Sequence, residues 1–468
     1  MTQNPYEPSK IPATPKEPAS PGDDLSQTGR NIILAAAFLG WMFSGFQMAL
    51  MTLSARAATT EFIRTGQVSA SQPLDLQRLL APLCLPTDSP PAISGEKEIM
   101  KQIGGPWFSW YQAAFLLGAA GGGLVFGWLG DHLGRVRAMG ASIFCFSIFS
   151  GLGYFVASPE QLLLLRVLSG MGVGGMWPTG VSLASEAWSD ASRPMISGLL
   201  GTSANVGLVA LNVLGYFFHV VPDSWRWTQL VCGAPVFLAI LVWAMVPESR
   251  RWLATRNQPH LAKQGASMAT VFRPPLLRLT LIGIAVGTIP LLGGWGATQW
   301  FIPWADKVGG AADPSAKALA GIMRSGGACI GGLIGGWLAS LAGRRLTYFL
   351  VSLASFGLGE FIYRMLTPSD AAFWPFVFVL GLVSTIYFGW LPLYLPELFP
   401  THARATGAGV SFNFGRILTA VGVLGAGAIT AAFNDDYARA GSITTLIYAV
   451  GMIVILFAPD TTKKRLED

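Results

Sequence analysis

Charge is scarce in this sequence. Of its 468 residues only 12% are Asp, Glu, Lys or Arg, whereas 52% are hydrophobic and the mean hydropathy is +0.49. Soluble domains usually carry about 25% charged residues. The composition therefore excludes an ordinary soluble protein and predicts a chain that lies mostly in a lipid bilayer.

Cysteine and histidine are also rare. The four cysteines and four histidines show none of the spacings of a zinc site or a disulfide framework. A Gly-rich phosphate-binding P-loop is missing too, which argues against ATP as an energy source. We therefore expect no metal, no cofactor and no enzymatic activity. The residues concerned are Cys84, Cys145, Cys232, Cys329, His132, His219, His260 and His402.

The net charge of +6 and the isoelectric point near 9.2 could indicate a nucleic-acid partner. The basic residues, however, lie in short segments between apolar runs instead of on one face. Such segments orient a membrane protein. We expect the lipid bilayer as partner and no nucleic acid.

Long hydrophobic runs are abundant. A helix needs about 20 apolar residues to cross a bilayer, and twelve runs meet this requirement. They predict an all-α membrane protein with twelve transmembrane helices. Many runs contain glycine, which allows close helix packing and need have no other role. The predicted spans are 31–54, 107–130, 137–157, 160–185, 195–220, 227–246, 276–300, 316–341, 346–366, 372–395, 405–432 and 440–458.

The chain repeats itself at about half its length. Three motifs recur in the same order with offsets of 209, 211 and 212 residues. A repeat of this size predicts two pseudo-symmetric six-helix bundles. The alternative is that positive loops resemble one another by chance. The matched pairs are G-W-L at Gly127 and Gly336, the seven-residue Glu–Arg spacing at Glu186 and Glu397, and the acidic residue after proline at Glu248 and Asp460.

The runs and repeats predict five regions. The first is a proline-rich, disordered cytoplasmic tail, and no cleavable signal peptide is expected because the apolar run that follows it is too long. The long outer loop either caps the outer mouth or is a tolerated insertion. The regions are the tail 1–30, the N-terminal half 31–246 with its outer loop 55–106, the central cytoplasmic loop 247–275, the C-terminal half 276–458 and the cytoplasmic tail 459–468.

The distribution of Lys and Arg predicts the orientation. With the N-terminus inside, eighteen of these residues fall in cytoplasmic segments and ten in outer ones, five of the ten in the long outer loop. Positive residues favour the cytoplasmic side, and long loops count least. Both termini are therefore predicted in the cytoplasm, with the two halves related by an axis along the membrane normal.

Four motifs together resemble those of the major facilitator superfamily. They are G-x-x-x-D-x-x-G-R from Gly127, R-V-L-S-G-M-G-V-G-G from Arg166, P-E-S-R-R-W-L from Pro247 and P-E-L-F-P-T-H-A-R-A-T-G from Pro396. The S-F-N-F-G-R of the eleventh run is similar to the metabolite:proton symporters, which include sialate and aromatic-acid carriers and lie near the sugar porters and organic-ion transporters. The resemblance implies a monomeric secondary transporter of the cytoplasmic (inner) membrane that works by alternating access.

The resemblance also implies a gating role for the inner motif residues. Asp131 could pair with Arg135 or accept hydrogen bonds from a helix N-terminus. In the second copy Ser340 replaces Asp131, so we expect the halves to contribute unequally. The alternative is a set of solvated charges that only set the orientation. The predicted gating residues are Gly127, Asp131, Gly134, Arg135, Glu186, Arg193, Glu248, Arg250, Arg251, Glu397 and Arg404.

Arg416 is the main candidate for substrate binding. It stands 12 residues beyond Arg404, which is about 18 Å along a helix and near the bilayer midplane. An intramembrane arginine is costly, and its planar fork suits a carboxylate. The alternative is a structural arginine that snorkels or pairs with Glu. The other predicted binding residues are amides and aromatics, which could instead form an interfacial belt: Asn413, Gln299, Trp295, Gln47, Tyr387 and Trp390.

The sequence leaves the substrate and the coupling ion open. Acid symporters of the resembled branch often carry carboxylates in helices 1 and 4, where this chain has Ser44, Gln47 and Met176. This difference puts a proton as coupling ion in doubt. The leading hypothesis is the transport of a small organic anion such as a sialic or aromatic acid. The alternatives are a carrier of a neutral sugar or organic cation, and a receptor on the same fold that does not transport.

Overall fold

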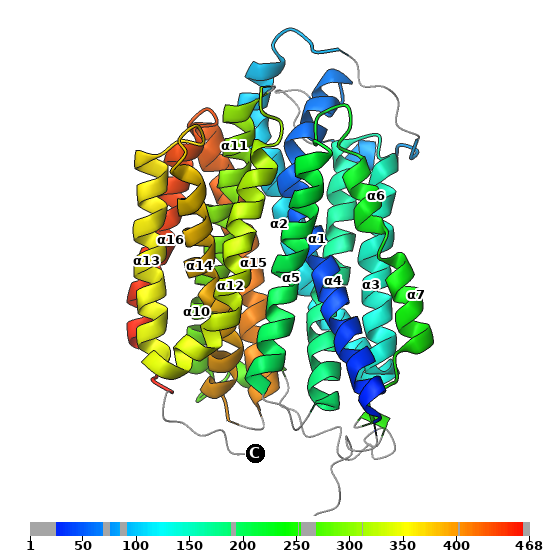
Figure 1. Cartoon of the computed structure of the whole chain (residues 1–468), viewed down its shortest axis with the longest axis vertical. Helices are drawn as coiled ribbons and strands as arrows, with labels where there is room; N and C mark the ends of the chain where they lie inside the picture. The colour runs from blue at the N-terminus through cyan, green and yellow to red at the C-terminus, as the bar shows by residue number, and fades with distance from the viewer. Residues whose placement is uncertain are drawn as a thin grey trace, which may run out of the picture.

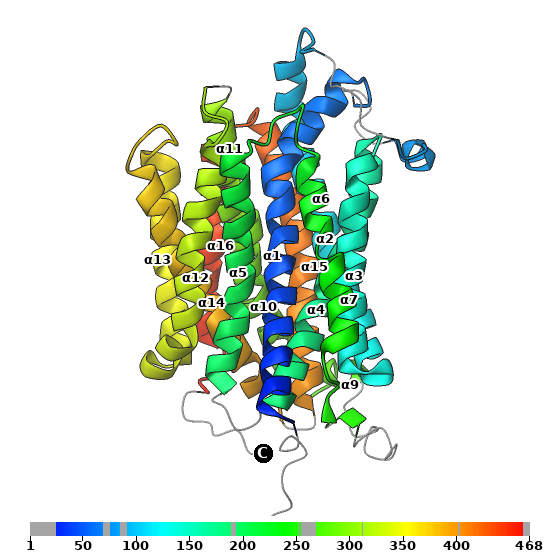
Figure 2. The same cartoon turned by 45° about the vertical axis from the view of Figure 1, so that its right-hand side comes forward.

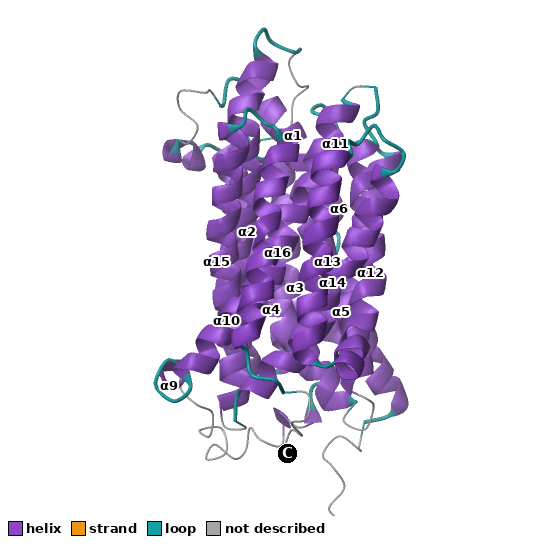
Figure 3. Cartoon of the chain, turned by 90° about the vertical axis from the view of Figure 1, so that its left-hand side faces the viewer, coloured by secondary structure: helices purple, strands orange, loops and turns teal. Residues whose placement is uncertain are grey.

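The computed structural model describes residues 25–68, 75–84, 91–188, 193–250, 252–253, 268–310, 312–400 and 403–461. Within these ranges the chain is almost entirely helical and contains no strand (Figure 3). The N-terminal helices are α1 (Gln27–Arg64), η1 (Leu76–Leu80), α2 (Glu96–Leu133), α3 (Arg135–Leu152), η2 (Gly153–Phe155), α4 (Pro159–Ala187), α5 (Arg193–Phe217), α6 (Trp227–Gly233) and α7 (Val236–Met245). The C-terminal helices are α9 (Met268–Val271), α10 (Leu277–Leu292), η3 (Gly293–Ala297), η4 (Thr298–Trp300), α11 (Phe301–Gly309), α12 (Ala316–Ala342), α13 (Arg344–Met365), α14 (Phe373–Leu398), α15 (Arg404–Ala432) and α16 (Tyr437–Phe457).

All twelve predicted spans coincide with helical segments. Within the described ranges, eleven segments are long and apolar enough to cross a membrane, with α6–α7 and α10–α11 each counted as one. The remaining predicted span, 160–185, is the 29-residue helix α4. The prediction of an all-α protein with membrane-spanning helices is confirmed.

Two helical bundles stand side by side (Figures 1 and 2). One contains α1 to α7 and the other α10 to α16, and they meet mainly through α2 against α15 and α5 against α12. The start of α1 and the end of α16 lie at the same end of the molecule, at the bottom of Figure 1. We call this the inner end, after the predicted orientation, and the opposite end the outer end.

Glycine allows several of these helices to touch along their backbones. A Cβ added at Gly122 of α2 would lie 1.9 Å from the carbonyl oxygen of Met171 in α4, and one at Gly174 of α4 would lie 2.0 Å from the carbonyl oxygen of Ala119. No side chain fits at such distances. Close backbone approach is how helices pack where lipid supplies no hydrophobic drive.

The first outer connection is shorter than predicted. Helix α1 continues to Arg64 and α2 begins at Glu96, so the connection spans 65–95 instead of 55–106. The sequence suggested a loop because charges follow the apolar run, but these charges are paired: Glu61 lies 2.7 Å from Arg226 and Arg64 lies 2.8 Å from Glu96. Paired charges can extend a helix beyond its apolar run.

The other predicted boundaries are partly covered. Helix α1 begins at Gln27, within the predicted tail 1–30. Residues 1–24, most of the central loop 247–275 and residues 462–468 lie outside the described ranges. The assignment of these segments to the cytoplasm stays a prediction.

The apolar core differs between the two ends. Near the outer end a single cluster joins both halves and includes Trp107, Trp225, Trp300 and Tyr437. Towards the inner end, one cluster around Tyr348 and Trp390 consists only of C-terminal residues. The corresponding cluster around Ile143 and Val173 has its buried members in the N-terminal half alone. The two halves therefore share a core at the outer end and have separate cores at the inner end.

The seventh span is irregular. Helix α10 passes into a π-helical turn at Gly293–Ala297 and a 3-10 turn at Thr298–Trp300 before α11 begins. A Cβ at Gly293 would lie 2.4 Å from the hydroxyl oxygen of Tyr448, so only glycine fits there. Such wide turns interrupt the hydrogen-bond ladder of a helix and frequently occur at functional sites.

Candidate functional site

A group of charged side chains lies at the inner end of the N-terminal half, where α2 turns into α3. Arg135 donates a hydrogen bond to Asp131, and its Nε lies 3.6 Å from Oε1 of Glu186 in α4. The Asp131 side chain is 64% exposed. Arg135 thus connects three helices of one half, and the gating role of Asp131, Arg135 and Glu186 stays a prediction.

Glu248 caps the start of α3. Its Oε1 and Oε2 lie 3.1 Å and 3.2 Å from the backbone nitrogen of Val136, which donates to them. A carboxylate is favourable at a helix N-terminus because the free N–H groups there carry partial positive charge. The N-cap residue of α3, Gly134, has no side chain to supply this bond. Glu248 therefore makes the contact with a helix N-terminus that was one of the two alternatives for Asp131, and Asp131 makes the other, the pair with Arg135.

The same arrangement recurs at the inner end of the C-terminal half. Arg344 contacts Glu397 through two nitrogens, with Nη2–Oε1 2.8 Å and Nε–Oε2 3.2 Å. Arg344 and Glu397 are the repeat partners of Arg135 and Glu186. The match extends to hydroxyl donors, because Ser249 donates to Glu186 and Thr461 donates to Glu397. The repeat found in the sequence is therefore also a repeat of contacts.

The seven-residue Glu–Arg spacing also predicts charge contacts of Glu186 with Arg193 and of Glu397 with Arg404, and these stay predictions. The contacts described above are those of Glu186 with Arg135 and of Glu397 with Arg344. The nearby Arg250 is exposed. The side chain of Arg193 and the whole of Arg251 lie outside what the structure describes.

Two glycines of the first motif have different surroundings. Gly134 has φ +114, and a Cβ there would lie 2.3 Å from Oε2 of Glu248. At Gly127 an added Cβ would meet nothing within 4 Å. Of the two, only Gly134 is required by the local geometry.

Gly134→Ala should therefore weaken both folding and transport. A non-glycine residue at such a φ costs about 1–3 kcal/mol, and the new methyl group would also displace Glu248 from α3. We expect a lower melting temperature and slower solute uptake in proteoliposomes. Gly127→Ala is the matched control, and equal losses in both variants would contradict this account of the motif.

Arg416 lies where the two halves meet. It is the thirteenth residue of the 29-residue helix α15, and only 8% of it is exposed. Its Nη1 lies 3.3 Å from the carbonyl oxygen of Ala119 in α2 and 3.3 Å from Oδ1 of Asn413. The guanidinium also stacks over the ring of Phe412 at 4.8 Å. These neighbours are all uncharged, so within the described part of the chain Arg416 has no carboxylate partner.

An aromatic wall adjoins the same interface. Trp295, in the π-helical turn of the C-terminal half, lies 5.6 Å from the ring of Phe115 in α2, centroid to centroid. Gln299, one turn further along, is buried, and its Oε1 has no hydrogen-bond partner in the described structure. Of the predicted binding residues, Arg416 and Asn413 contact α2, Trp295 faces it, and Gln299 keeps a free acceptor.

Three predicted binding residues lie inside one half instead. The amide of Gln47 is occupied at both ends, because it donates to the carbonyl of Cys232 at 2.8 Å and accepts from Ser150. Tyr387 hydrogen-bonds to Ser352 at 2.6 Å, and Trp390 donates to the carbonyl of Arg344 at 2.9 Å. Polar aromatic and amide side chains in an apolar run suggested a binding site, but here their polar groups form hydrogen bonds within one bundle.

Arg166, so far only a motif residue, is buried as deeply as the apolar core. Arg166 belongs to α4 and is 1% exposed, and its guanidinium carbon lies 4.4 Å from the ring centroid of Phe115 in α2. Its Nη2 donates to the carbonyl oxygen of Gln47, while Nε and Nη1 have no partner in the described structure. The signal in the sequence that could have indicated this burial is the position of Arg166 within an apolar run of 26 residues.

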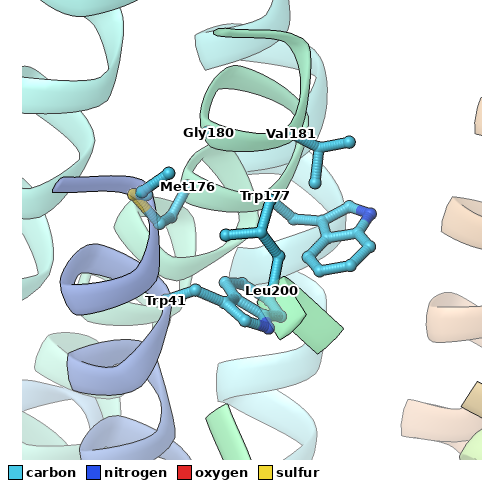
Figure 4. Close-up of a pocket in the computed structure, with 7 residues that line it drawn as sticks. Trp41, Met176, Trp177, Gly180, Val181 and Leu200 are labelled. Atoms are coloured by element: carbon cyan, nitrogen blue, oxygen red, sulfur yellow. The ribbon is translucent and has the colours of Figure 1, made fainter. Parts of the chain in front are cut away.

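A narrow apolar pocket lies between α1, α4 and α5 (Figure 4). Trp41 and Trp177 form one side, with ring centroids 4.9 Å apart. The lining has no charged group, so this pocket does not suit a carboxylate. It is lined by Ala37, Trp41, Met176, Trp177, Gly180, Val181 and Leu200.

Several curated proteins are similar to this chain along most of its length. The inner membrane metabolite transport protein YgcS of Escherichia coli is 28% identical and covers 74% of this chain and 81% of its own. The cis,cis-muconate transport protein of Acinetobacter baylyi is 28% identical, with 65% and 74% covered. The gallate transporter of Pseudomonas putida is 27% identical, with 68% and 76% covered.

Solved structures show the same architecture. A partially occluded, inward-open form of the xylose transporter XylE from E. coli superimposes with a TM-score of 0.66 at 16% identity, over 94% of this chain and 100% of that one. The sequence model of the Major Facilitator Superfamily matches residues 90–423, more than half of the chain. The protein is therefore a membrane transporter, not an enzyme, and belongs to the Major Facilitator Superfamily.

Proposed function

We propose that this protein moves a small organic anion, a carboxylate on an aromatic or unsaturated frame, across the cytoplasmic membrane by alternating access. The observation that carries the proposal is Arg416. It is a buried guanidinium at the contact between the halves, and every described contact of its side chain is to an uncharged group.

The cost of burying charge supports this role. An arginine near the middle of a membrane is expensive unless it meets an anion or water. A carbonyl oxygen and an amide oxygen accept from only some of the five N–H donors of the guanidinium. The planar guanidinium can also donate to both oxygens of a carboxylate. A substrate carboxylate would therefore supply the missing negative charge.

The aromatic wall supports an unsaturated substrate. Trp295 and Phe115 come from opposite halves, so a flat solute beside them would contact both. Aromatic faces with a few convergent polar groups are typical of sites for small, partly apolar ligands. The relatives named for cis,cis-muconate and gallate carry solutes of this kind.

Alternating access agrees with the self-contained charge clusters at the inner end. The Arg135–Glu186 and Arg344–Glu397 contacts each lie within one half. The halves can then rotate against each other at that end without breaking these contacts.

We further propose that the protein lies in the inner membrane as a monomer, with both termini in the cytoplasm. The candidate coupling ion is a proton, and the candidate proton carriers are Asp131 and Glu360.

The proposal is tested by ligand binding with matched acids and amides. The purified protein is heated with benzoate or benzamide, nicotinate or nicotinamide, muconate, gallate, hexoses and tetraethylammonium. A ligand of the folded state adds about 2.7 kcal/mol of stability at a hundredfold excess over Kd. We expect the melting temperature to rise with the acids and much less with their amides. Shifts with hexoses or the cation alone would contradict the proposal.

A further inference from the structure

Five charged residues gather at the outer end, on both sides of the contact between the halves. Arg56 belongs to α1, Asp306 and Lys307 to α11, Lys317 to α12, and Asp435 to the turn between α15 and α16. We call these five residues the outer latch. Only Arg56 comes from the N-terminal half.

Arg56 reaches two acidic residues of the other half. Its Nε lies 3.5 Å from Oδ2 of Asp306, and its Nη1 lies 3.2 Å from Oδ2 of Asp435. The same Nη1 donates to the hydroxyl oxygen of Tyr437 at 3.3 Å. One side chain therefore holds α1 against α11 and against the turn before α16.

A second link crosses between the halves at Lys317. Its Nζ lies 3.1 Å from Oδ1 of Asp306 and donates to the carbonyl oxygen of Val220, which follows α5. Lys307 donates to the carbonyl oxygen of Asp435 at 2.6 Å and keeps that turn in place. Asp306 is thus the shared partner of a cation from each half.

Lys307 is exposed and the Arg56 side chain is 26% exposed, whereas the other three latch residues are shielded from water. The side chains of Asp435 and Lys317 are 1% and 5% exposed, and that of Asp306 is 16% exposed. Charge pairs that are shielded in this way are weakened little by salt. The apolar cluster that joins the halves, with Trp300 and Tyr437, lies next to them.

The turn that carries Asp435 is strained. Asn434 and Asp435 have φ of 53° and 66°, and they are the only non-glycine residues with positive φ in the described structure. Such backbone costs about 1–3 kcal/mol per residue and persists where surrounding contacts enforce it. Here the strained turn presents its carboxylate to Arg56 and its carbonyl to Lys307.

The ion pairs described above at the inner end join Arg135 to Asp131 and Glu186, and Arg344 to Glu397, and each of these pairs lies within one half. We propose that the outer latch is the gate of the outer face: it holds the outer ends together in this conformation and must break before a solute can enter from that side. The proposal does not depend on which solute is carried.

The experiment measures the distance between the outer ends. Spin labels are placed at Thr65→Cys, after α1, and at Ser369→Cys, between α13 and α14, both exposed, after the four native cysteines have been replaced. We expect a short distance in the parent protein in lipid nanodiscs. Arg56→Gln should add a longer distance and raise the share of the open form about tenfold, a typical size for coupling between sites.

Asp306→Asn tests the same latch from the other half. We expect it to open the outer face as Arg56→Gln does, and the double variant to open it less than the sum of the two single effects, because both variants remove the Arg56–Asp306 contact. Arg439→Gln is the matched control, since Arg439 pairs with Asp436 within one half. Melting temperatures show that the variants are folded. Unchanged distances in both latch variants, or equal opening in Arg439→Gln, would overturn the proposal.

Discussion

Arg416→Gln should reduce uptake of the carboxylate substrate by at least about thirtyfold. Removing one partner of a buried, hydrogen-bonded charge pair costs about 2–5 kcal/mol, and the glutamine amide carries no charge to replace it. The variant should still fold, because the bonds from Arg416 to Ala119 and Asn413 are two weak contacts of 3.3 Å to uncharged groups. Uptake of labelled substrate into proteoliposomes measures the effect.

Two further variants separate a binding role from a structural one. Arg416→Lys keeps the charge and loses the fork, so we expect an intermediate loss. Arg439→Gln removes an exposed arginine that pairs with Asp436 in the same half, and it should transport normally. If Arg416→Gln transports at the parental rate, Arg416 is structural and a neutral sugar or a cation becomes the better candidate substrate.

Gly122→Ala should prevent the N-terminal half from packing. The added methyl carbon would lie 1.9 Å from the carbonyl oxygen of Met171, and backbone atoms cannot rotate away as a side chain can. Helices α2 and α4 would have to separate along their length, which removes contacts throughout the half. We expect little folded protein after purification and a clear fall in melting temperature.

The neighbouring residue provides the control. At Gly121 an added Cβ would meet nothing within 4 Å, so Gly121→Ala changes the same helix by the same group without a clash. Alanine also favours a helix over glycine by about 1 kcal/mol. Gly121→Ala should therefore match or exceed the parent in stability, and similar behaviour of the two variants would show that the α2–α4 contact tolerates separation.

The sequence predicted the fold well because membrane helices depend on local composition. Twelve apolar runs correspond to helical segments, and the repeat offset of about 210 residues anticipated which residues are equivalent. The sequence could not predict which charged side chains contact each other, since these contacts depend on how the helices cross. Glu186, for example, contacts Arg135, which lies 51 residues earlier in the chain and belongs to another helix.

The candidate binding site was harder to predict for the same reason. Whether a polar side chain in an apolar run faces the other half or its own bundle depends on helix rotation, and this separates Arg416 from Gln47 and Tyr387. The outer latch carries no motif at all. Arg56 and Asp435 are 379 residues apart and meet only after both halves have folded.

The irregular turns in the seventh span divide it into an inner helix, α10, and an outer helix, α11. Helix α10 ends at Leu292, and α11, which begins at Phe301, carries Asp306 and Lys307 of the latch. A wide turn between two stiff segments concentrates bending at a few backbone angles. A change in the backbone angles of these turns would therefore move Asp306 and Lys307 relative to α10.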